Sequence, residues 1–371
     1  MRVTNSMMIH NMVYWSSKQL DKLNEASTVV ASGKEINKPS DNATATRQIL
    51  EDRTTLSSYD QYEYNIELAQ TWINFSDTTL SSVYSLLQEA QDVVISDISP
   101  ESDDAETTAM TLQAIYDQIL SMANELYGTE YMYSGNSSDT VPFSSEVTIS
   151  GGTAGDMIFN LASATSSTTV EVTDDDGNVV RTITVSGGTE GTNTVSWDGL
   201  DDSGNALPDG DYTFTVTATD SGGAAVASYP AYRGGSESKE YVIGKSSTIS
   251  LNNNGDSLFS PTLKVLSRMI TALQDTATTS VSTADFADAL DTAITGIKNQ
   301  EVLLSNANSI ATNMADRLDT LSNTIENRVS DLENGDTTTA ATELTVQETT
   351  YEITQNALAS VLTMPKLSDY L

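Results

Sequence analysis

Apolar residues recur at alternating spacings of three and four through the first third of the chain. After Asp41 the pattern is strict, and its members are Ile66, Ala69, Ile73, Ser76, Leu80, Val83, Leu87, Ala90 and Val94. Pro100 interrupts it, the acidic run that follows can begin a new helix, and the same spacing continues from Ala105 to Leu126, just before Gly128. This spacing is typical of helices that pack as coiled coils. The sequence therefore predicts two long helices in an antiparallel pair.

The helical spacing returns in the last third of the chain. It begins at about Pro261, and its apolar members are Leu263, Leu266, Ile270, Leu273, Phe286, Leu290, Ile294, Ile297, Val302, Leu304, Ala311, Met314, Leu318, Leu321, Ile325 and Leu332. Arg328 is a polar member of this series, and Asn-Gly-Asp at 334–336 predicts a break. At about 1.5 Å per residue, a helix over 41–100 would reach roughly 80 Å, which favours a fibrous or axial role.

The two ends of the chain carry thinner apolar stripes. The N-terminal stripe consists of Ile9, Val13, Leu20, Leu23 and Val30, and the C-terminal stripe consists of Leu344, Tyr351, Leu358 and Val361. Ser16 and Ser27 interrupt the first stripe. A helix with so little apolar surface is marginal by itself in water. Beside an ordinary internal helical core, the pattern therefore predicts an assembly interface, in which neighbouring subunits cover and order both ends.

A turn separates the N-terminal stripe from the long helix after it. The segment SGKEINKPSDN spans residues 32–42. A glycine can end a helix, a proline moves the preceding residue out of the helical region, and Ser40 or Asp41 can cap the next helix. The residues that predict this turn are Ser32, Gly33, Asn37, Pro39, Ser40 and Asp41.

The middle of the chain changes from helical spacing to a period of two. Between about 137 and 260, runs such as TTVEVTD, RTITVSG and DYTFTVTATD are separated by Asp-Gly and Gly-Asn pairs. Alternation with such turns predicts antiparallel strands joined by hairpins. The centre is therefore expected to be an all-β insertion, of the sandwich type, between helical ends.

Charge and composition exclude several classes of function. The chain has 17 Lys+Arg, 52 Asp+Glu and a formal charge of −35, so phosphate backbones and anionic membranes would be repelled. It has no cysteine, and His10 is its single histidine, which removes thiolate chemistry and most zinc sites. No cleavable signal and no apolar run of 18 residues is visible. An enzyme, a nucleic-acid partner and a membrane partner are not expected.

Three segments resemble ligand-binding motifs, but each lacks residues that the motif requires. Gly244-Lys245-Ser246 resembles the end of a phosphate-binding loop, but Lys239 occupies the position of the first glycine. The acidic run 174–177 resembles a calcium loop, yet its first and twelfth ligand positions would be Val172 and Ile183. The acidic loop 201–211 offers only a weak cation site. No catalytic, cofactor-binding or metal-ligating residue is therefore predicted.

The terminal segments resemble the flagellin superfamily. The resemblance rests on MRVTNSMM, on SGKEINKPSDNATATRQI, on the Asn-, Ser- and Ala-rich heptads up to residue 135, and on the C-terminal heptads ending in LASVLTMPKLSDYL. MRVTNSMM, KPSDN and GTEYMYSGN followed by VPF are most similar to the hook-filament junction proteins, the hook-associated protein 3 group. The resemblance implies that the chain ends form an inner helical tube, partly disordered in the monomer, and that the centre projects outward.

The β insertion resembles the immunoglobulin-like module of hook-capping proteins. The resemblance rests on Trp197, Gly199, Gly204, Pro208, Gly210 and Tyr212. It implies that the two aromatic residues pack between sheets, while Gly-Asn and Asp-Gly pairs form tight turns. The flanking pieces resemble the small outer domain of the junction proteins.

These resemblances imply an α+β multidomain fold with a helical, coiled-coil-like rod built from both chain ends. Terminal helices are expected at 1–40 and 333–371, and the rod at 41–136 and 261–332. A small outer β domain is expected at 137–146 and 229–260, and the immunoglobulin-like sandwich at 147–228.

The implied function is a secreted structural subunit at the hook-filament junction of the bacterial flagellum. The implied partners are copies of itself in a ring, hook-associated and filament flagellin subunits, and a flagellar export chaperone that serves type III export. Filament flagellin, or a secreted adhesin-like module carried by the β insertion, are the alternatives.

Overall fold

The computed structural model describes residues 5–97, 105–251, 254–275 and 283–363. The predicted helix stop at Pro100, the helix start after it and the chain beyond Thr363 lie outside these ranges. The chain divides into two compact units: unit 1 is residues 1–64 with 314–371, and unit 2 is residues 65–313. Two long helices, α2 (Ala43–Asp97) and α5 (Thr283–Glu333), contribute to both units.

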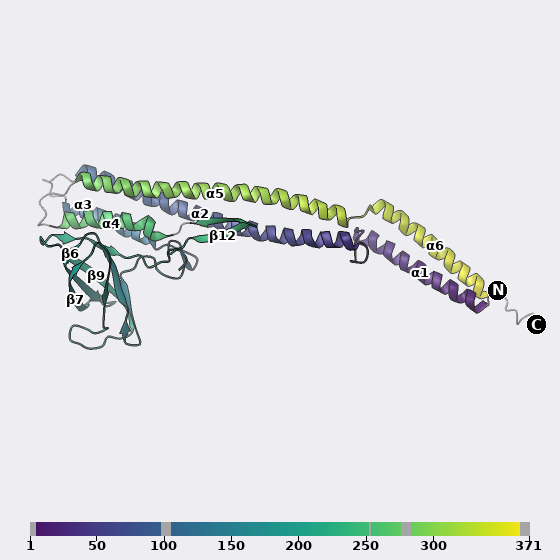
Figure 1. The fold of residues 1–371 in the computed structure, drawn as a ribbon, viewed down its shortest axis with the longest axis horizontal. Coiled ribbons are helices and arrows are strands. Elements are labelled where there is room, and N and C mark those ends of the chain that lie inside the picture. The colour runs from purple at the N-terminus through teal and green to yellow at the C-terminus, as the bar shows by residue number, and fades with distance from the viewer. Residues whose placement is uncertain (1–4, 98–104, 252–253, 276–282, 364–371) are drawn as a thin grey trace, which may run out of the picture. The chain divides into compact units, whose positions relative to one another are not determined.

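Unit 1 contains the two terminal helices. Helices α1 (Asn5–Ser32) and α6 (Thr337–Thr363) pack side by side, purple and yellow in Figure 1. Among their described side chains only Ser16, Ala340 and Val361 are buried. The hydroxyl of Ser16 accepts a 2.8 Å hydrogen bond from Gln355 Nε2 on α6. The predicted packing of the two chain ends on each other is confirmed, and the layer of buried side chains between them is thin.

Unit 2 has a much better packed helical core. Every residue of the predicted stripe from Ile66 to Val94 is buried. In this unit α2 and α5 run antiparallel, because Gln70 Nε2 donates to Thr312 Oγ1 at 3.2 Å while Lys298 Nζ lies 4.7 Å from the ring centroid of Tyr84. Helix α3 (Ala105–Ala123) packs against α4 (Gly255–Gln274).

Three helical expectations were wrong in detail. Helix α3 ends at Ala123, and Leu126 is 48% exposed in a short strand. Helix α4 begins at Gly255 rather than at Pro261, because the side chain of its N-cap residue Asn254 accepts a hydrogen bond from the amide of Asp256. Pro261 lies inside α4, where a proline supplies no helical donor for the carbonyl of Ser257. Val302 is 67% exposed, and the buried face passes instead through Gln300 and Leu304.

The central strands form a two-layer sandwich with antiparallel pairing. One sheet has the order β4-β3-β9-β6-β7, with β10 beside β9, and the other has the order β11-β5-β8. The bounds are β3 Glu146–Ser150, β4 Thr153–Ala154, β5 Asp156–Leu161, β6 Thr165–Thr173, β7 Val179–Gly188, β8 Gly191–Ser196, β9 Gly210–Thr219, β10 Ala225–Val226 and β11 Ser228–Pro230. The core between the layers includes Met157, Phe159, Val170, Trp197 and Phe214. Alternating strands bury one face each, as the period of two predicts.

Four short strands lie outside the sandwich, in the segments of chain that connect it to α3 and α4. They are β1 (Leu126–Tyr127), β2 (Glu130–Tyr131), β12 (Lys239–Gly244) and β13 (Ser247–Leu251). Lys239 ties them to α2, since its Nζ lies 2.6 Å from Glu130 Oε2 and 4.2 Å from the ring centroid of Trp72. Lys245 and Ser246 form the turn between β12 and β13. A strand-turn-strand context is not that of a phosphate-binding loop, which leads from a strand into a helix.

The α+β fold class, with helices from both chain ends around a central β insertion, is confirmed. Within the part of the chain that the structure describes, no helix combines the length and the hydropathy needed to cross a bilayer.

Two neighbouring leucines of α5 test the assignment of its buried face. Leu304 is 4% exposed and Leu303 is 57% exposed. Leu304→Ala should lower the free energy of unfolding of unit 2 by about 2–5 kcal/mol, because it leaves a cavity. Leu303→Ala should change it by no more than about 0.5 kcal/mol. Hydrogen exchange of the α5 amides within unit 2 measures both, and equal effects would show that the buried face is misassigned.

Candidate assembly interface

Unit 1 contains two breaks between consecutive helices, one between α1 and α2 and one between α5 and α6, and the two breaks lie next to each other. The amide of Gly33, whose φ is +69°, donates to the carbonyl of Val29 at 2.9 Å and ends α1. Asn42 caps α2, since its Oδ1 accepts from the amide of Ala45 at 3.1 Å. The sequence suggested Ser40 or Asp41 as the cap of α2, and this prediction was wrong, because Asn42 is the cap. Helix α5 ends at Glu333, and Asp336 caps α6 by accepting from the amide of Thr338 at 2.9 Å.

The backbones of the two breaks pair with each other. Lys34 and Asn334 form an isolated antiparallel bridge. The amide of Glu35 donates to the carbonyl of Glu333 at 2.7 Å, and the amide of Gly335 donates to the carbonyl of Gly33 at 3.3 Å. Helix ends leave amides and carbonyls without helical partners. In unit 1 each break supplies partners for the other.

Glu333 is the charged centre of this pairing. The residue is 8% exposed, and its carboxylate lies 2.7 Å from Lys34 Nζ and also pairs with Arg53 on α2. A second ion pair joins the same helices, because Arg328 Nε donates to buried Asp52 at 2.7 Å. The hydrogen bond that Arg328 donates to Asp52 raises the pKa of Arg328 above its usual value. Arg328, predicted as a polar member of the α5 stripe, therefore holds α5 to α2.

The predicted turn residues close the loop between α1 and α2. Asp41 Oδ2 accepts hydrogen bonds from the amides of Lys38 at 2.8 Å and Asn37 at 3.0 Å, and these bonds lower the pKa of Asp41. The side-chain amide of Asn37 donates to the carbonyl of Lys34 at 2.7 Å, and Ser32 Oγ accepts from the amide of Lys34 at 3.1 Å. Pro39 and Ser40 lie exposed at the outer side of the loop.

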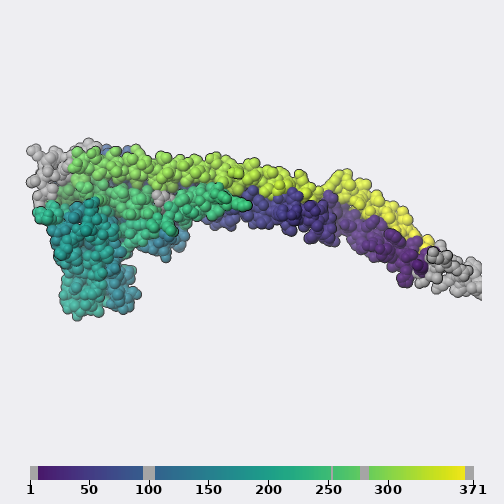
Figure 2. Space-filling view, in the orientation of Figure 1, coloured from purple at the N-terminus to yellow at the C-terminus, as the bar shows by residue number. Residues whose placement is uncertain are grey.

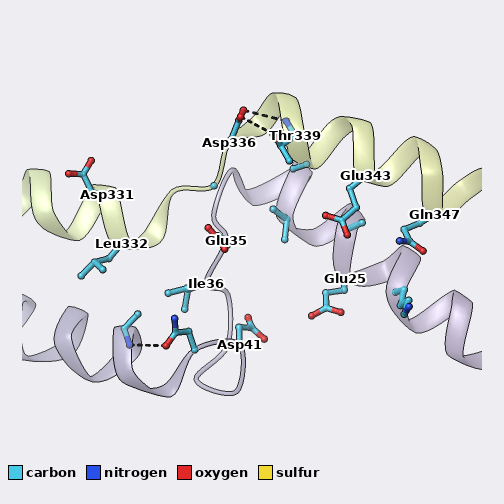
Figure 3. A pocket seen from close by; sticks show the side chains of 17 residues that line it. Glu25, Glu35, Ile36, Asp41, Asp331, Leu332, Asp336, Thr339, Glu343 and Gln347 are labelled. Atoms are coloured by element: carbon cyan, nitrogen blue, oxygen red, sulfur yellow. Dashed lines mark hydrogen bonds between the residues drawn. The ribbon is translucent and has the colours of Figure 1, made fainter.

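A groove of about 790 Å³ opens beside the two breaks. Figure 3 shows Glu35, Asp41 and Glu343 among the side chains around it. Its charged lining residues are Lys22, Glu25, Glu35, Asp41, Asp331, Asp336 and Glu343. Hydrogen bonds from the Thr339 hydroxyl and from backbone amides lower the pKa of Asp336, so this carboxylate has a structural role. Among the described residues no group of acidic or histidine side chains has metal-binding geometry.

The structure divides the predicted assembly residues into two sets. Leu344, Tyr351, Leu358 and Val361 lie on the face of α6 toward α1, and Ile9 and Leu23 are half-buried on α1. Val13, Leu20 and Val30 are 51%, 40% and 36% exposed, so they lie outside the helix pair. Ser27 is also exposed, and the inner face of α1 includes the polar residues Ser16 and Gln19, which hydrogen-bond to Gln355 and Gln347 on α6. The apolar spacing alone therefore selected the wrong members for part of the stripe.

Several large apolar residues of the terminal helices were missed. On α1 these are Met7, Tyr14 and Trp15, at 59%, 57% and 63% exposure, and on α6 they are Val346 and Ile353, at 55% and 63%. In the space-filling view, α1 and α6 lie side by side as the purple and yellow surfaces of unit 1 (Figure 2). The sequence did contain a signal for these residues. Both terminal helices have few apolar residues in the predicted stripe, yet they carry large apolar residues at other positions.

The signature residues of the β module form its core and one of its turns. The rings of Trp197 and Tyr212 meet edge to face with centroids 5.4 Å apart, and Tyr212 donates its hydroxyl to the carbonyl of Pro208 at 2.9 Å. Gly199 and Gly204 have φ of +76° and +82°, so they occupy turn positions that suit glycine. Gly210 differs from the expectation: it begins β9 and has no positive φ.

Acidic residues of the module are used in turns. Asp174, Asp201 and Asp220 each accept hydrogen bonds through Oδ1 from the amides two and four residues later, at 2.7–3.1 Å. A glycine with positive φ follows each of them at the third position. Hydrogen bonds from Asn178 and Asn205 lower the pKa of Asp174 and of Asp201, respectively. These carboxylates stabilise turns between strands, in agreement with the hairpins that the Asp-Gly and Gly-Asn pairs predicted.

Removing the carboxylate of Glu333 tests the paired breaks. Glu333→Ala should lower the local stability of unit 1 by about 1–2 kcal/mol, because Lys34 and Arg53 lose a partner but remain partly solvated. Hydrogen exchange of the amides of residues 33–42 measures the change. Glu326→Ala, at an exposed position of α5, is the matched control and should have no comparable effect. Equal exchange in both variants would contradict the assigned role.

The turn should depend on the ionised form of Asp41. Because the folded turn lowers the pKa of Asp41 below its ordinary value of 3.8, its stabilising effect is present above that value and is lost as the pH falls through the lowered pKa. The amide NMR signals of Asn37 and Lys38 should therefore titrate below pH 3.8. Asp41→Asn should abolish this titration, and Asp60→Asn on α2 should preserve it. A titration midpoint at or above the ordinary value would contradict the geometry.

Two families match separate parts of the chain. Residues 3–138 match the family described as the bacterial flagellin N-terminal helical region. Residues 144–222 match the FlgD Ig-like domain.

Characterised relatives match over short stretches. Flagellar hook-associated protein 3 of Escherichia coli K12 is 28% identical over 120 residues, which are 32% of this chain and 38% of that protein. The basal-body rod modification protein FlgD of Salmonella typhimurium is 39% identical over 59 residues, which are 16% of this chain and 25% of that protein. The chain thus matches less than half the length of each relative.

The crystal structure of Bacillus cereus FlgL aligns with 77% of this chain and 99% of its own, at 13% identity and a TM-score of 0.39. By the two family matches, residues 3–138 carry a flagellin-type N-terminal helical region and residues 144–222 an FlgD-type immunoglobulin-like domain, which confirms the resemblances seen in these two segments of the sequence.

Proposed function

We propose that this protein is a non-catalytic structural subunit that joins the hook of the bacterial flagellum to its filament. The main support for the proposal is the helix pair α1 and α6. Few side chains are buried between these two helices, while their outer surfaces expose aromatic and aliphatic side chains. Large exposed apolar surfaces mark sites of protein contact. The flagellin-type region at 3–138 and the 28% identity to a flagellar hook-associated protein 3 support the flagellum as the place of assembly.

The partners follow from this role. Copies of the chain form a ring, with hook-associated subunits on one side and filament flagellin on the other. Before assembly, an export chaperone holds the C-terminal helix, and the chain leaves the cell through the flagellar type III channel. In the assembled ring the terminal helices contact neighbours through exposed side chains, and the β module faces outward. These side chains are Val13, Leu20 and Val30 of the predicted stripe, together with Tyr14, Trp15 and Ile353.

Immunogold electron microscopy of intact flagella tests the proposal. Antibody against the β module should label a narrow band at the distal end of the hook. Label along the whole filament would instead identify the protein as a flagellin, the nearest alternative.

The same experiment tests the terminal helices. Trp15→Ser with Ile353→Ser should remove the band, because each large apolar side chain buried in a contact contributes about 1.5–3 kcal/mol, or roughly tenfold or more in affinity. Met110→Ser is the control, since Met110 is also 63% exposed but lies on α3 in unit 2. Unchanged labelling in the double variant would show that these helices are not the contact surface.

A further inference from the structure

A shallow hollow of about 390 Å³ lies on the outer side of α2, next to the turn after α1. Its lining residues are Pro39, Ala43, Thr46, Arg47, Leu50, Glu51 and Thr54. Leu50 is 58% exposed, although Ile49 beside it is buried. Arg47 lies one turn before Leu50, with its side chain 74% exposed and 3.8 Å from Glu51. The hollow therefore presents an aliphatic side chain beside Arg47 and Glu51, a loosely paired cation and anion.

A second hollow of about 370 Å³ lies on α6. Its lining residues are Thr338, Thr339, Thr342, Glu343, Val346 and Gln347. Val346 is 55% exposed, and Glu343 lies one turn before it. This hollow is similar in size to the first and presents an aliphatic side chain beside an anion.

The two hollows do not contact each other within one chain. Leu50 is seven residues into α2 and Val346 nine residues into α6, and these helices lead away from the paired breaks with different partners, α5 and α1. At about 1.5 Å per residue, the two side chains are about 10 Å and about 13 Å from the breaks. Each copy therefore offers one hollow of each kind on different surfaces.

The charges around the two hollows indicate which molecule binds at each of them. The chain carries a formal charge of −35, so a second copy is repelled unless one of its few cations meets an acid. Arg47, 74% exposed, is the cation of the α2 hollow and reaches Glu51 only at 3.8 Å, while Glu343 is the charged residue that lines the α6 hollow. Complementary charge on two different surfaces produces a heterologous contact, which closes into a ring when the rotation allows.

We propose that the α2 hollow around Leu50 docks on the α6 hollow around Val346 of a second copy of this chain. The inference rests on the proposed function, since it requires that copies assemble side by side. The inference adds to the proposed function the residues that make the contact. It also implies that neighbouring copies are displaced along the helix axis by about 20–25 Å, the sum of the distances of Leu50 and Val346 from the breaks.

Disulfide cross-linking tests the contact directly, because the chain has no cysteine of its own. Leu50→Cys with Val346→Cys, in one chain expressed in cells that lack their own junction protein, should give a ladder of covalent oligomers in isolated flagella under oxidation. Each single variant should remain monomeric. Tyr64→Cys with Val346→Cys is the matched control, because Tyr64 is 57% exposed on the same helix but two heptads beyond Leu50.

The outcomes separate the inference from the proposed function. Motile cells whose flagella contain the variant but show no ladder would overturn the docking alone. Dimers of the Leu50→Cys variant alone would also overturn it, since they require a contact between identical surfaces. Absence of the protein from flagella, with every variant and with the unmodified chain, would overturn the proposed function as well.

Charge reversal gives an independent measure in the full-length chain. Arg47→Glu or Glu343→Lys should each weaken incorporation about two- to fivefold, the range expected for an exposed ion pair. The chain with both reversals should recover toward the unmodified level. Additive losses in the double variant would contradict the pairing of the two hollows.

Discussion

Unit 1 depends on two interruptions of long helices that meet and pair. A helix end leaves backbone amides and carbonyls that need other partners, and one buried break is costly. Here Glu333 serves both needs at once, because its carbonyl accepts from the amide of Glu35 while its carboxylate binds Lys34 and Arg53. The glycines on each side, Gly33 and Gly335, also pair through their backbone. The direction in which α1 and α6 leave the breaks is thereby set by few contacts, most of them polar.

The distribution of apolar side chains gives the two units different roles. In unit 2, Leu80, Val83 and Leu87 are completely buried on α2, so that helix is stable within the chain. Among their described side chains, helices α1 and α6 instead bury three, of which Val361 is the one large apolar residue, and they expose ten large apolar residues. Helical stability in proteins comes mainly from packing of an apolar face. A subunit built this way has a self-sufficient part and a part whose stability increases when neighbours cover it.

The sequence predicted what depends on local spacing and missed what depends on distant partners. The α2 stripe was predicted residue by residue, because a repeat of three and four identifies a helix face without knowledge of its partner. On α1 the same rule included Val13 and Leu20, because the residues that face α6, such as Ser16, are polar. The partnership of Lys34 with Glu333 joins residues 299 positions apart, which no local pattern encodes. The break after Glu333 and the turn at Gly33 were each predicted, but their pairing was not.

The way the β module is inserted explains how a helical subunit can carry it. The chain that enters the module pairs with the chain that leaves it: Phe143 and Tyr232 form a backbone bridge, and Arg233 donates from its amide to Pro142 at 2.8 Å and from Nη2 to Glu146 at 2.9 Å. Entry and exit points that lie together leave the helices around them undisturbed, and the module keeps its own core around Trp197. The carboxylates of Asp174, Asp201 and Asp220 accept backbone amides within the module, so its turns are held by contacts of its own.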